Sequence, residues 1–286
     1  MPRVVAPKPV ASGFGRTDAP PRRGPKRPAL QAVHDAIVSC ELCPRLRRYC
    51  ERIGREKRRA FRDETYWAKP VPGFGDPQAR LLVVGLAPAA HGANRTGRVF
   101  TGDGMGGSGD FLMAALHRSG FANIPTSQHP GDGLALRDAF IAAAVRCAPP
   151  DNKPTPEEIA RCLPHLEAEL VALPRVSVVV ALGKIGFDAY LQLLKRGGVS
   201  ARPRPRFDHG GAHQLPNGQT LFGCYHPSRQ NTNTGKLTAR MMDDVFTKVR
   251  EVLDPGCRDP FAENAIAVGR IRNEHVAETA KGSRHR

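Results

Sequence analysis

The chain has 286 residues, of which 40% are hydrophobic and 24% charged, so it can bury a substantial apolar core. Lys and Arg outnumber Asp and Glu by 43 to 27, and this net charge of +16 favours a polyanionic partner such as nucleic acid. Because no apolar run could span a membrane and the N-terminus has no signal-peptide pattern, we expect a cytoplasmic protein with no membrane partner.

The two ends of the chain differ in composition from the middle. Residues 1–28 contain seven prolines, seven Lys or Arg and a single acid, too few apolar groups to offset the entropy of ordering. We therefore predict a disordered basic arm over 1–28, a folded domain over 29–255 and a polar tail over 256–286.

A cysteine pair and a basic stretch open the folded domain. Cys40 and Cys43 have the C-x-x-C spacing that lets two thiolates from one turn bind a metal or cluster. Residues 44–62 follow, with nine Lys or Arg against two Glu on one predicted helix. Such density suits contact with a phosphate backbone, although a solvated helix face remains an alternative.

Short valine-rich runs then alternate with amphipathic stretches. The runs have the length of buried strands and cover 81–86, 140–145, 176–182 and 220–225. The amphipathic stretches have the length of helices and cover 109–119, 156–172, 184–195 and 236–253. This alternation predicts an α/β sandwich with a mainly parallel central sheet.

Two more cysteines bracket a loop in the middle of the domain. Cys147 lies at the end of a predicted strand, and Cys162 lies on a predicted helix with Thr155 as its N-cap and Pro156 at its first position. With the earlier pair they make four thiolates, the number that an iron–sulfur cluster or a structural zinc needs. Spacing does not decide between the two metals. We expect the remaining three cysteines to be small buried hydrophobic residues without a ligand role: Cys50, Cys224 and Cys257.

Long polar loops follow two of the predicted strands, over 85–103 (GLAPAAHGANRTGRVFTGD) and 223–238 (GCYHPSRQNTNTGKLT). Open α/β sheets bind ligands at the carboxyl ends of their strands, so both loops should border one cleft. Together with 144–158 (AVRCAPPDNKPTPEE), they resemble the family 5 uracil-DNA glycosylases of bacteria and archaea. The resemblance runs from about Cys40 to about Val252.

The resemblance implies a three-layer α/β/α fold and a four-iron, four-sulfur (4Fe-4S) cluster with a structural role. Its ligands would be Cys40, Cys43, Cys147 and Cys162. It also implies a monofunctional glycosylase of base excision repair, acting as a monomer on double-stranded DNA. The enzyme would flip uracil and other deaminated or damaged bases out of the helix and hydrolyse their N-glycosidic bonds.

The resemblance also assigns roles to single residues. His226 would hydrogen-bond the base carbonyl, Asp103 would position water and stabilise the cationic sugar, and Asn152 would help with either task. Phe100 would stack on the flipped base, with Ala87 beside it. The predicted DNA contacts are Arg95, Arg98, Ser228, Arg229, Gln230 and Asn231. The sequence leaves open whether Arg95 and Arg98 hold phosphates or structural carbonyls.

One segment departs from the family pattern. Asp103 is followed by Gly104, Met105, Gly106 and Gly107 before Ser108, where the family has one or two residues. These extra residues lie beside the expected active site, so we expect them to loosen the catalytic loop or enlarge the pocket and thereby to affect which bases are excised.

Three alternatives remain at this point. The first is a non-enzymatic iron–sulfur DNA-binding regulator, which would leave both polar loops without a role. The second is a metal-dependent nuclease that recruits Asp103, Asp110, His91 and His226. The third is a family 4 glycosylase, which characteristically has an acid where this chain has Leu86.

Overall fold

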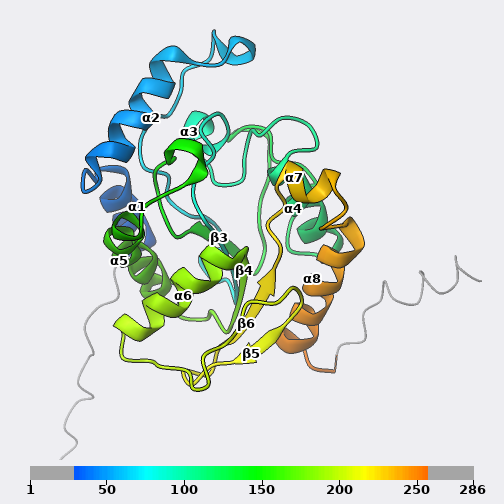
Figure 1. Cartoon of the computed structure of the whole chain (residues 1–286). Helices are drawn as coiled ribbons and strands as arrows, with labels where there is room; N and C mark the ends of the chain where they lie inside the picture. Colours follow the sequence, from blue (N-terminus) through cyan, green and yellow to red (C-terminus); the bar gives the residue numbers. More distant parts are fainter. Residues whose placement is uncertain (1–28, 257–286) are drawn as a thin grey trace, which may run out of the picture.

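The computed structural model describes residues 29–256, and these residues form a three-layer α/β/α domain (Figure 1). A single six-stranded sheet runs in the order β1-β3-β2-β4-β6-β5. The strands are β1 (Phe74–Gly75), β2 (Leu81–Gly85), β3 (Ala139–Ala143), β4 (Val178–Leu182), β5 (Ala212–Gln214) and β6 (Thr220–Cys224). The four central strands are parallel, and the short edge strands β1 and β5 are antiparallel to their neighbours.

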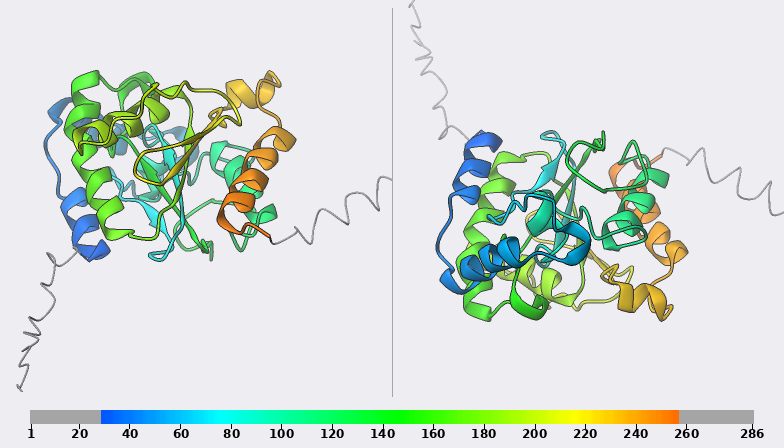
Figure 2. Two further views of the ribbon diagram at one scale, coloured as in Figure 1. Left: turned by 90° about the horizontal axis from the view of Figure 1, so that it is seen from below. Right: turned by 90° about the horizontal axis from the view of Figure 1, so that it is seen from above.

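Helices cover both faces of the sheet, and Figure 2 shows the sheet between them. The α-helices are α1 (Leu30–Val38), α2 (Pro44–Glu56), α3 (Ala93–Thr96), α4 (Ser108–Arg118), α5 (Pro156–Ala172), α6 (Lys184–Arg196), α7 (Arg229–Asn233) and α8 (Ala239–Leu253). Two short 3-10 helices are η1 (Arg59–Phe61) and η2 (Pro150–Asn152). Helices α1, α5 and α6 pack on one face, and α4 and α8 pack on the other.

Strand geometry divides the apolar residues between two cores. Successive side chains of a strand point to opposite faces, so Leu81 and Val83 pack toward α4 and α8 while Leu82 and Val84 pack toward α5 and α6. All four are fully buried. A parallel sheet covered on both faces needs continuous apolar strands, which explains the valine-rich runs of the sequence.

The predicted elements agree well with the structure. All four predicted strands and four predicted helices are present, and α5 spans the predicted residues. At its start the Thr155 side chain accepts from the Glu158 N–H and the Glu158 carboxylate accepts from the Thr155 N–H. This capping box confirms the predicted N-cap.

Several element boundaries differ from the prediction, and β3, for example, ends at Ala143 rather than Val145. Helix α8 begins at Ala239 rather than Lys236, because Thr238 caps it. The basic stretch is not one helix, since α2 ends at Glu56 and η1 follows. Cys147 lies beyond the end of β3 rather than at the end of a strand. The predicted arm 1–28 and nearly all of the predicted tail, including Cys257, lie outside the described residues.

No helix of the described part of the chain is both long and apolar enough to cross a bilayer.

Candidate active site

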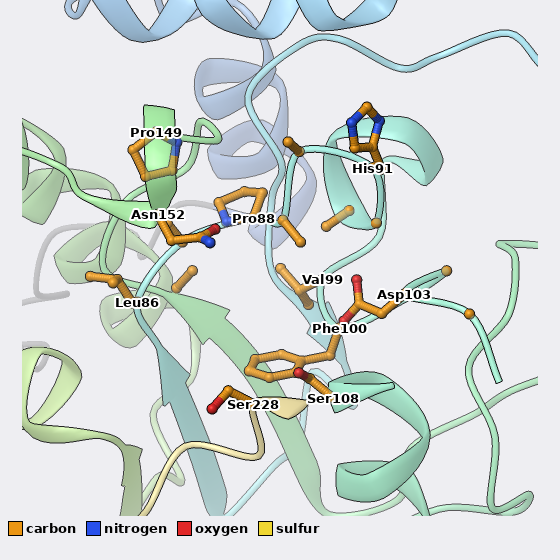
Figure 3. Close-up of a pocket in the computed structure, with 18 of the residues that line it drawn as sticks. Leu86, Pro88, His91, Val99, Phe100, Asp103, Ser108, Pro149, Asn152 and Ser228 are labelled. Carbon is orange, nitrogen blue, oxygen red and sulfur yellow. The ribbon is translucent and has the colours of Figure 1, made fainter. Parts of the chain in front are cut away.

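A cleft of about 920 Å³ opens at the carboxyl ends of the central strands. Both polar loops identified in the sequence contribute to its wall, as do η2 and the segment around η1. Figure 3 shows Asn152 and Pro149 on one side of the opening, Asp103 on the other, and Phe100 and Ser228 below. The two loops therefore border one cleft, as the strand order predicts.

Phe100 forms the floor of the cleft, resting on the end of β2. A Cβ atom at Gly85 would lie only 2.8 Å from the Phe100 ring, so glycine is what lets the ring settle over the strand. Phe100 has a left-handed backbone, with φ of 50°, that turns the ring toward the cleft. The His226 ring lies beside it, with 5.9 Å between ring centroids and 33° between ring planes.

Asp103 lies in a cradle of glycines. A Cβ atom at Gly92 would be 1.8 Å from the Asp103 Oδ1 atom, and one at Gly107 would be 2.7 Å from the Asp103 Cβ atom. Burial raises the pKa of the Asp103 carboxyl to about 6, although the Gly109 N–H and the Arg229 guanidinium both act to lower it. The carboxyl is therefore mainly charged at neutral pH and becomes neutral in mild acid.

His226 follows β6 and is fixed through its backbone. The Asn231 side chain on α7 donates a hydrogen bond of 2.8 Å to the His226 carbonyl oxygen. Burial lowers the pKa of the His226 imidazole to about 4. The ring is consequently neutral at physiological pH and can donate one N–H to a ligand in the cleft.

Asn152 lies on the wall across from Asp103, and Ala87 also lines the cleft. Asn152 has φ of 56° and belongs to η2, where Asp151 has φ of 52°. Two consecutive non-glycine residues with left-handed backbones form a strained turn of the kind found at functional sites. The Asn152 amide is exposed to the cleft and can both donate and accept hydrogen bonds.

The loop after β6 contributes Ser228 and Arg229 to the cleft. Ser228 caps α7 by accepting a hydrogen bond from the Asn231 N–H. The Arg229 guanidinium donates to the Asp103 carbonyl oxygen at 3.1 Å, which ties the two loops together. Gln230 is exposed beside them.

Arg95 and Arg98 are both turned inward. Arg95 pairs with Glu64, stacks on the Phe61 ring and donates to the Gly102 carbonyl oxygen. Arg98 pairs with Asp132 and bonds to neighbouring hydroxyl groups. Both side chains are more than nine-tenths buried. These contacts favour the structural alternative over a role in DNA binding, because both guanidinium groups are buried and bonded to protein oxygens.

The residues that a metal-dependent nuclease would recruit do not gather at one point. Asp110 accepts hydrogen bonds from the Ser127 N–H and the Gln128 side chain and does not line the cleft. His91 lines the cleft but is hydrogen-bonded to the Tyr66 hydroxyl. The nuclease alternative therefore has no support from this geometry.

The cysteines of the predicted cluster lie together beneath α2. Cys147 and Cys162 are 7% exposed and pack with Cys43 in a small apolar cluster. Burial raises the pKa of the Cys43 thiol, with smaller contributions from Cys147, Glu158 and Cys40. The Arg146 N–H donates to the Cys162 Sγ atom at 3.2 Å. In the described residues, no three potential ligands are close enough to hold a single metal ion.

The donor set itself suits a cluster. The four predicted ligands are all thiols, and soft thiolates select iron–sulfur centres or zinc. Cys50, predicted to be an ordinary buried residue, is fully buried in the same apolar cluster as Cys147, and its thiol donates to the Ala148 carbonyl oxygen at 3.6 Å.

Sequence reasoning missed several residues of the site. Tyr49, Arg58 and Phe61 line the cleft, so the basic segment forms part of its rim. Gly92 supports Asp103, and Tyr66 supports His91. The sequence hinted at a role for Gly92 only through its place in a glycine-rich loop. No sequence pattern predicted the contacts between segments that are far apart along the chain, such as that of Tyr66 with His91.

Comparison with known proteins agrees with this geometry. The model of the uracil DNA glycosylase superfamily matches residues 72–250. A type-5 uracil-DNA glycosylase of Mycobacterium leprae is 53% identical over 225 residues, which cover 78% of this chain and 96% of the relative. One of Thermus thermophilus is 50% identical over 222 residues, which cover 78% of this chain and 97% of the relative.

A type-4 uracil-DNA glycosylase of Pyrobaculum aerophilum is more distant, at 30% identity over 168 residues, which cover 58% of this chain and 67% of the relative. The higher identities all fall on the type-5 group. The chain belongs to the uracil-DNA glycosylase superfamily, and within it to the type-5 enzymes.

Proposed function

We propose that this protein removes uracil, and other deaminated or damaged bases, from DNA by hydrolysing the N-glycosidic bond, as a first step of base excision repair. The observation that carries this proposal is the cleft in which Phe100, Asp103, Asn152 and His226 come together. An aromatic ring lies at the floor of this cleft and polar side chains lie on both sides, an arrangement that suits a flat base.

The reaction needs a base outside the helix. Base flipping costs a few kcal/mol of unstacking, and stacking on an aromatic ring returns about 1–3 kcal/mol per base. Phe100 supplies that ring at the floor of the cleft. Stacking is insensitive to the identity of the base, which supports a range wider than uracil.

Breaking the glycosidic bond separates charge. The departing base becomes negative, and the neutral His226 ring can donate its N–H to the base carbonyl. The sugar becomes cationic, and the Asp103 carboxylate, charged at neutral pH, stabilises it and orients a water molecule. Asn152 holds the base or the water from the opposite wall.

Hydrolysis by water fits the composition of the cleft. A bifunctional glycosylase needs an amine that attacks the sugar and forms a Schiff base. Among the described residues that line the cleft there is no lysine. This lining supports a monofunctional enzyme, and we propose that it acts as a monomer.

A basic rim supports DNA as the substrate. Six exposed arginines of α2, η1 and their flanks have no carboxylate partner among the described residues, and they are Arg48, Arg52, Arg55, Arg58, Arg59 and Arg62. Since Arg58 also lines the cleft, this rim lies beside the base-binding site. We expect these side chains, with Ser228, Arg229 and Gln230, to contact phosphates around the flipped nucleotide.

The four clustered cysteines fit a 4Fe-4S cluster. Bound there, such a cluster would cross-link the start of α2, the segment after β3 and α5, so its contribution is to folding. Cys147→Ser is expected to lose iron, sulfide and the brown colour, and to unfold at lower temperature. Cys50→Ser, next to Cys147 but outside the proposed ligand set, is expected to keep all three. A colourless wild type that contains zinc would contradict the cluster.

The activity itself has a direct test. The purified protein is incubated with a duplex containing one uracil in excess EDTA and then treated with alkali, which breaks the strand only at an abasic site. We expect cleavage that depends on alkali, because a monofunctional glycosylase leaves the strand intact. An unbroken strand would instead favour the DNA-binding regulator, and breakage without alkali would favour a strand-cutting enzyme.

A further inference from the structure

His91 lines the cleft, and the chemistry described so far gives it no task. Its backbone carbonyl accepts a hydrogen bond of 3.0 Å from the Arg95 guanidinium. The Nδ1 atom of its ring lies 3.0 Å from the Tyr66 hydroxyl oxygen. Arg95 and Tyr66 are both buried, so the protein fixes the position of the His91 ring before any ligand binds.

The Tyr66 hydroxyl decides which nitrogen of the His91 ring carries the proton. The hydroxyl oxygen already accepts a hydrogen bond of 3.4 Å from the Arg58 N–H. Its own proton needs an acceptor, because a buried donor without a partner is unfavourable. The His91 Nδ1 atom is the acceptor within reach. Tyr66 therefore donates to Nδ1, and the neutral His91 ring carries its proton on Nε2 as a free donor.

The charges around His91 favour an anion beside it. Burial, with smaller contributions from the Arg58 and Arg95 guanidinium groups, lowers the pKa of the His91 imidazole, so the ring is neutral at physiological pH. Arg58 also lines the cleft, is exposed, and has no carboxylate partner among residues 29–256. The cations that disfavour a second proton on the ring attract a negative group to the same place.

The position of the ring indicates which part of the DNA it meets. Figure 3 shows the His91 ring at the edge of the opening, on the side of Asp103 and turned away from Phe100. A base that stacks on Phe100 therefore lies away from this ring. Its sugar, on which Asp103 is proposed to act, lies on the same side as His91. The anions attached to that sugar are its two phosphates.

We propose that His91 donates its Nε2–H to a phosphate oxygen next to the flipped nucleotide, and that Tyr66 is the positioning residue that fixes the ring and its proton. This inference rests on the proposed function. The exposed arginines of the rim attract the backbone from many directions, whereas a neutral donor held at two points binds one oxygen in one direction. The contact thus sets the register of the backbone at the cleft.

A neutral phosphate analogue tests this contact. The duplex carries 2′-fluoro-deoxyuridine, whose glycosidic bond resists hydrolysis, and each phosphate beside it is replaced in turn by a methylphosphonate. We expect one replacement to weaken binding by wild type about tenfold, since it removes a charged acceptor. The same replacement should change binding by His91→Ala very little. A methylphosphonate five nucleotides away is the control and should affect both proteins equally.

Three further variants complete the test. His91→Gln keeps an N–H donor and should restore most of the binding that His91→Ala loses. Tyr66→Phe should weaken binding by itself and add little in the His91→Ala background, because it acts through the ring. His117→Ala removes an exposed histidine at the end of α4 away from the cleft, and it should bind as wild type does.

Two results would overturn the inference while wild type still releases uracil from an ordinary duplex. The first is an equal effect of every flanking methylphosphonate on wild type and His91→Ala, which would exclude the phosphate contact. The second is an equal loss from Tyr66→Phe in both backgrounds, which would exclude its action through His91. A wild type that releases no uracil and binds the analogue no better than an undamaged duplex would overturn the proposed function instead.

Discussion

Gly92 gives the sharpest test of how the cleft works. This residue contributes no functional group, yet a methyl group at its Cα would lie 1.8 Å from the Asp103 Oδ1 atom. Because Cβ atoms essentially never come within 3.0 Å of another heavy atom, Gly92→Ala must displace the carboxylate by more than about 1 Å. A shift of that size in a catalytic group can cost about a hundredfold in rate, or about 2.7 kcal/mol of transition-state stabilisation.

Single-turnover excision from a uracil-containing duplex measures this effect without interference from product release. We expect Gly92→Ala to lose about a hundredfold while it binds the duplex nearly as well as wild type. Gly131→Ala is the matched control, because the nearest atom to its added methyl would be 3.6 Å away, an ordinary contact.

A double-mutant cycle separates displacement of Asp103 from general damage to the loop. If Gly92 acts through Asp103, then Gly92→Ala should have little further effect in an Asp103→Asn background. Full activity of Gly92→Ala, or an undiminished loss in the Asp103→Asn background, would refute the assigned role of the cradle.

The remaining predictions concern the titration and the hydrogen bonds of the site. Since the Asp103 carboxyl has a pKa near 6 and must be charged to act, the single-turnover rate should be level above that pH and fall about tenfold per unit below it. Arg229→Ala removes a cation that lowers this pKa, so the midpoint should move to higher pH; an unmoved midpoint would exclude Asp103 as the titrating group. His226→Ala should lower the rate about a hundredfold and His226→Asn, which keeps an N–H donor, by less; equal losses would exclude hydrogen bonding as its role. Asn152→Ala should reduce the rate while thermal unfolding stays as in wild type, because the side chain is exposed; a lower unfolding temperature would indicate a structural role instead.

Much of the architecture could be predicted from the sequence, because its causes are local. Valine-rich runs become buried parallel strands wherever both faces of a sheet are covered, and the Thr155 and Glu158 pair starts a helix by satisfying free N–H groups. The edge strands β1 and β5 were missed because they have only two and three residues. A strand that short has no period to detect.

The site could be predicted only in part. The two polar loops were expected to meet because strand ends share an edge of the sheet, and the cleft confirms this. The inward position of Arg95 and Arg98 was not decidable, since their carboxylate partners, Glu64 and Asp132, are 31 and 34 residues away. The cradle of Asp103 depends on how closely the backbone at Gly92 and Gly107 approaches the Asp103 side chain. No sequence pattern encodes such a distance.

The central claim is that Asp103 and His226 act from one cleft on a base flipped out of DNA. The most direct measurement is single-turnover release of uracil from a U·G duplex in excess EDTA, for wild type, Asp103→Asn and His226→Ala. The account predicts release by wild type that survives EDTA and falls by about two orders of magnitude in each variant, with duplex binding nearly unchanged. Wild-type rates in both variants would contradict it.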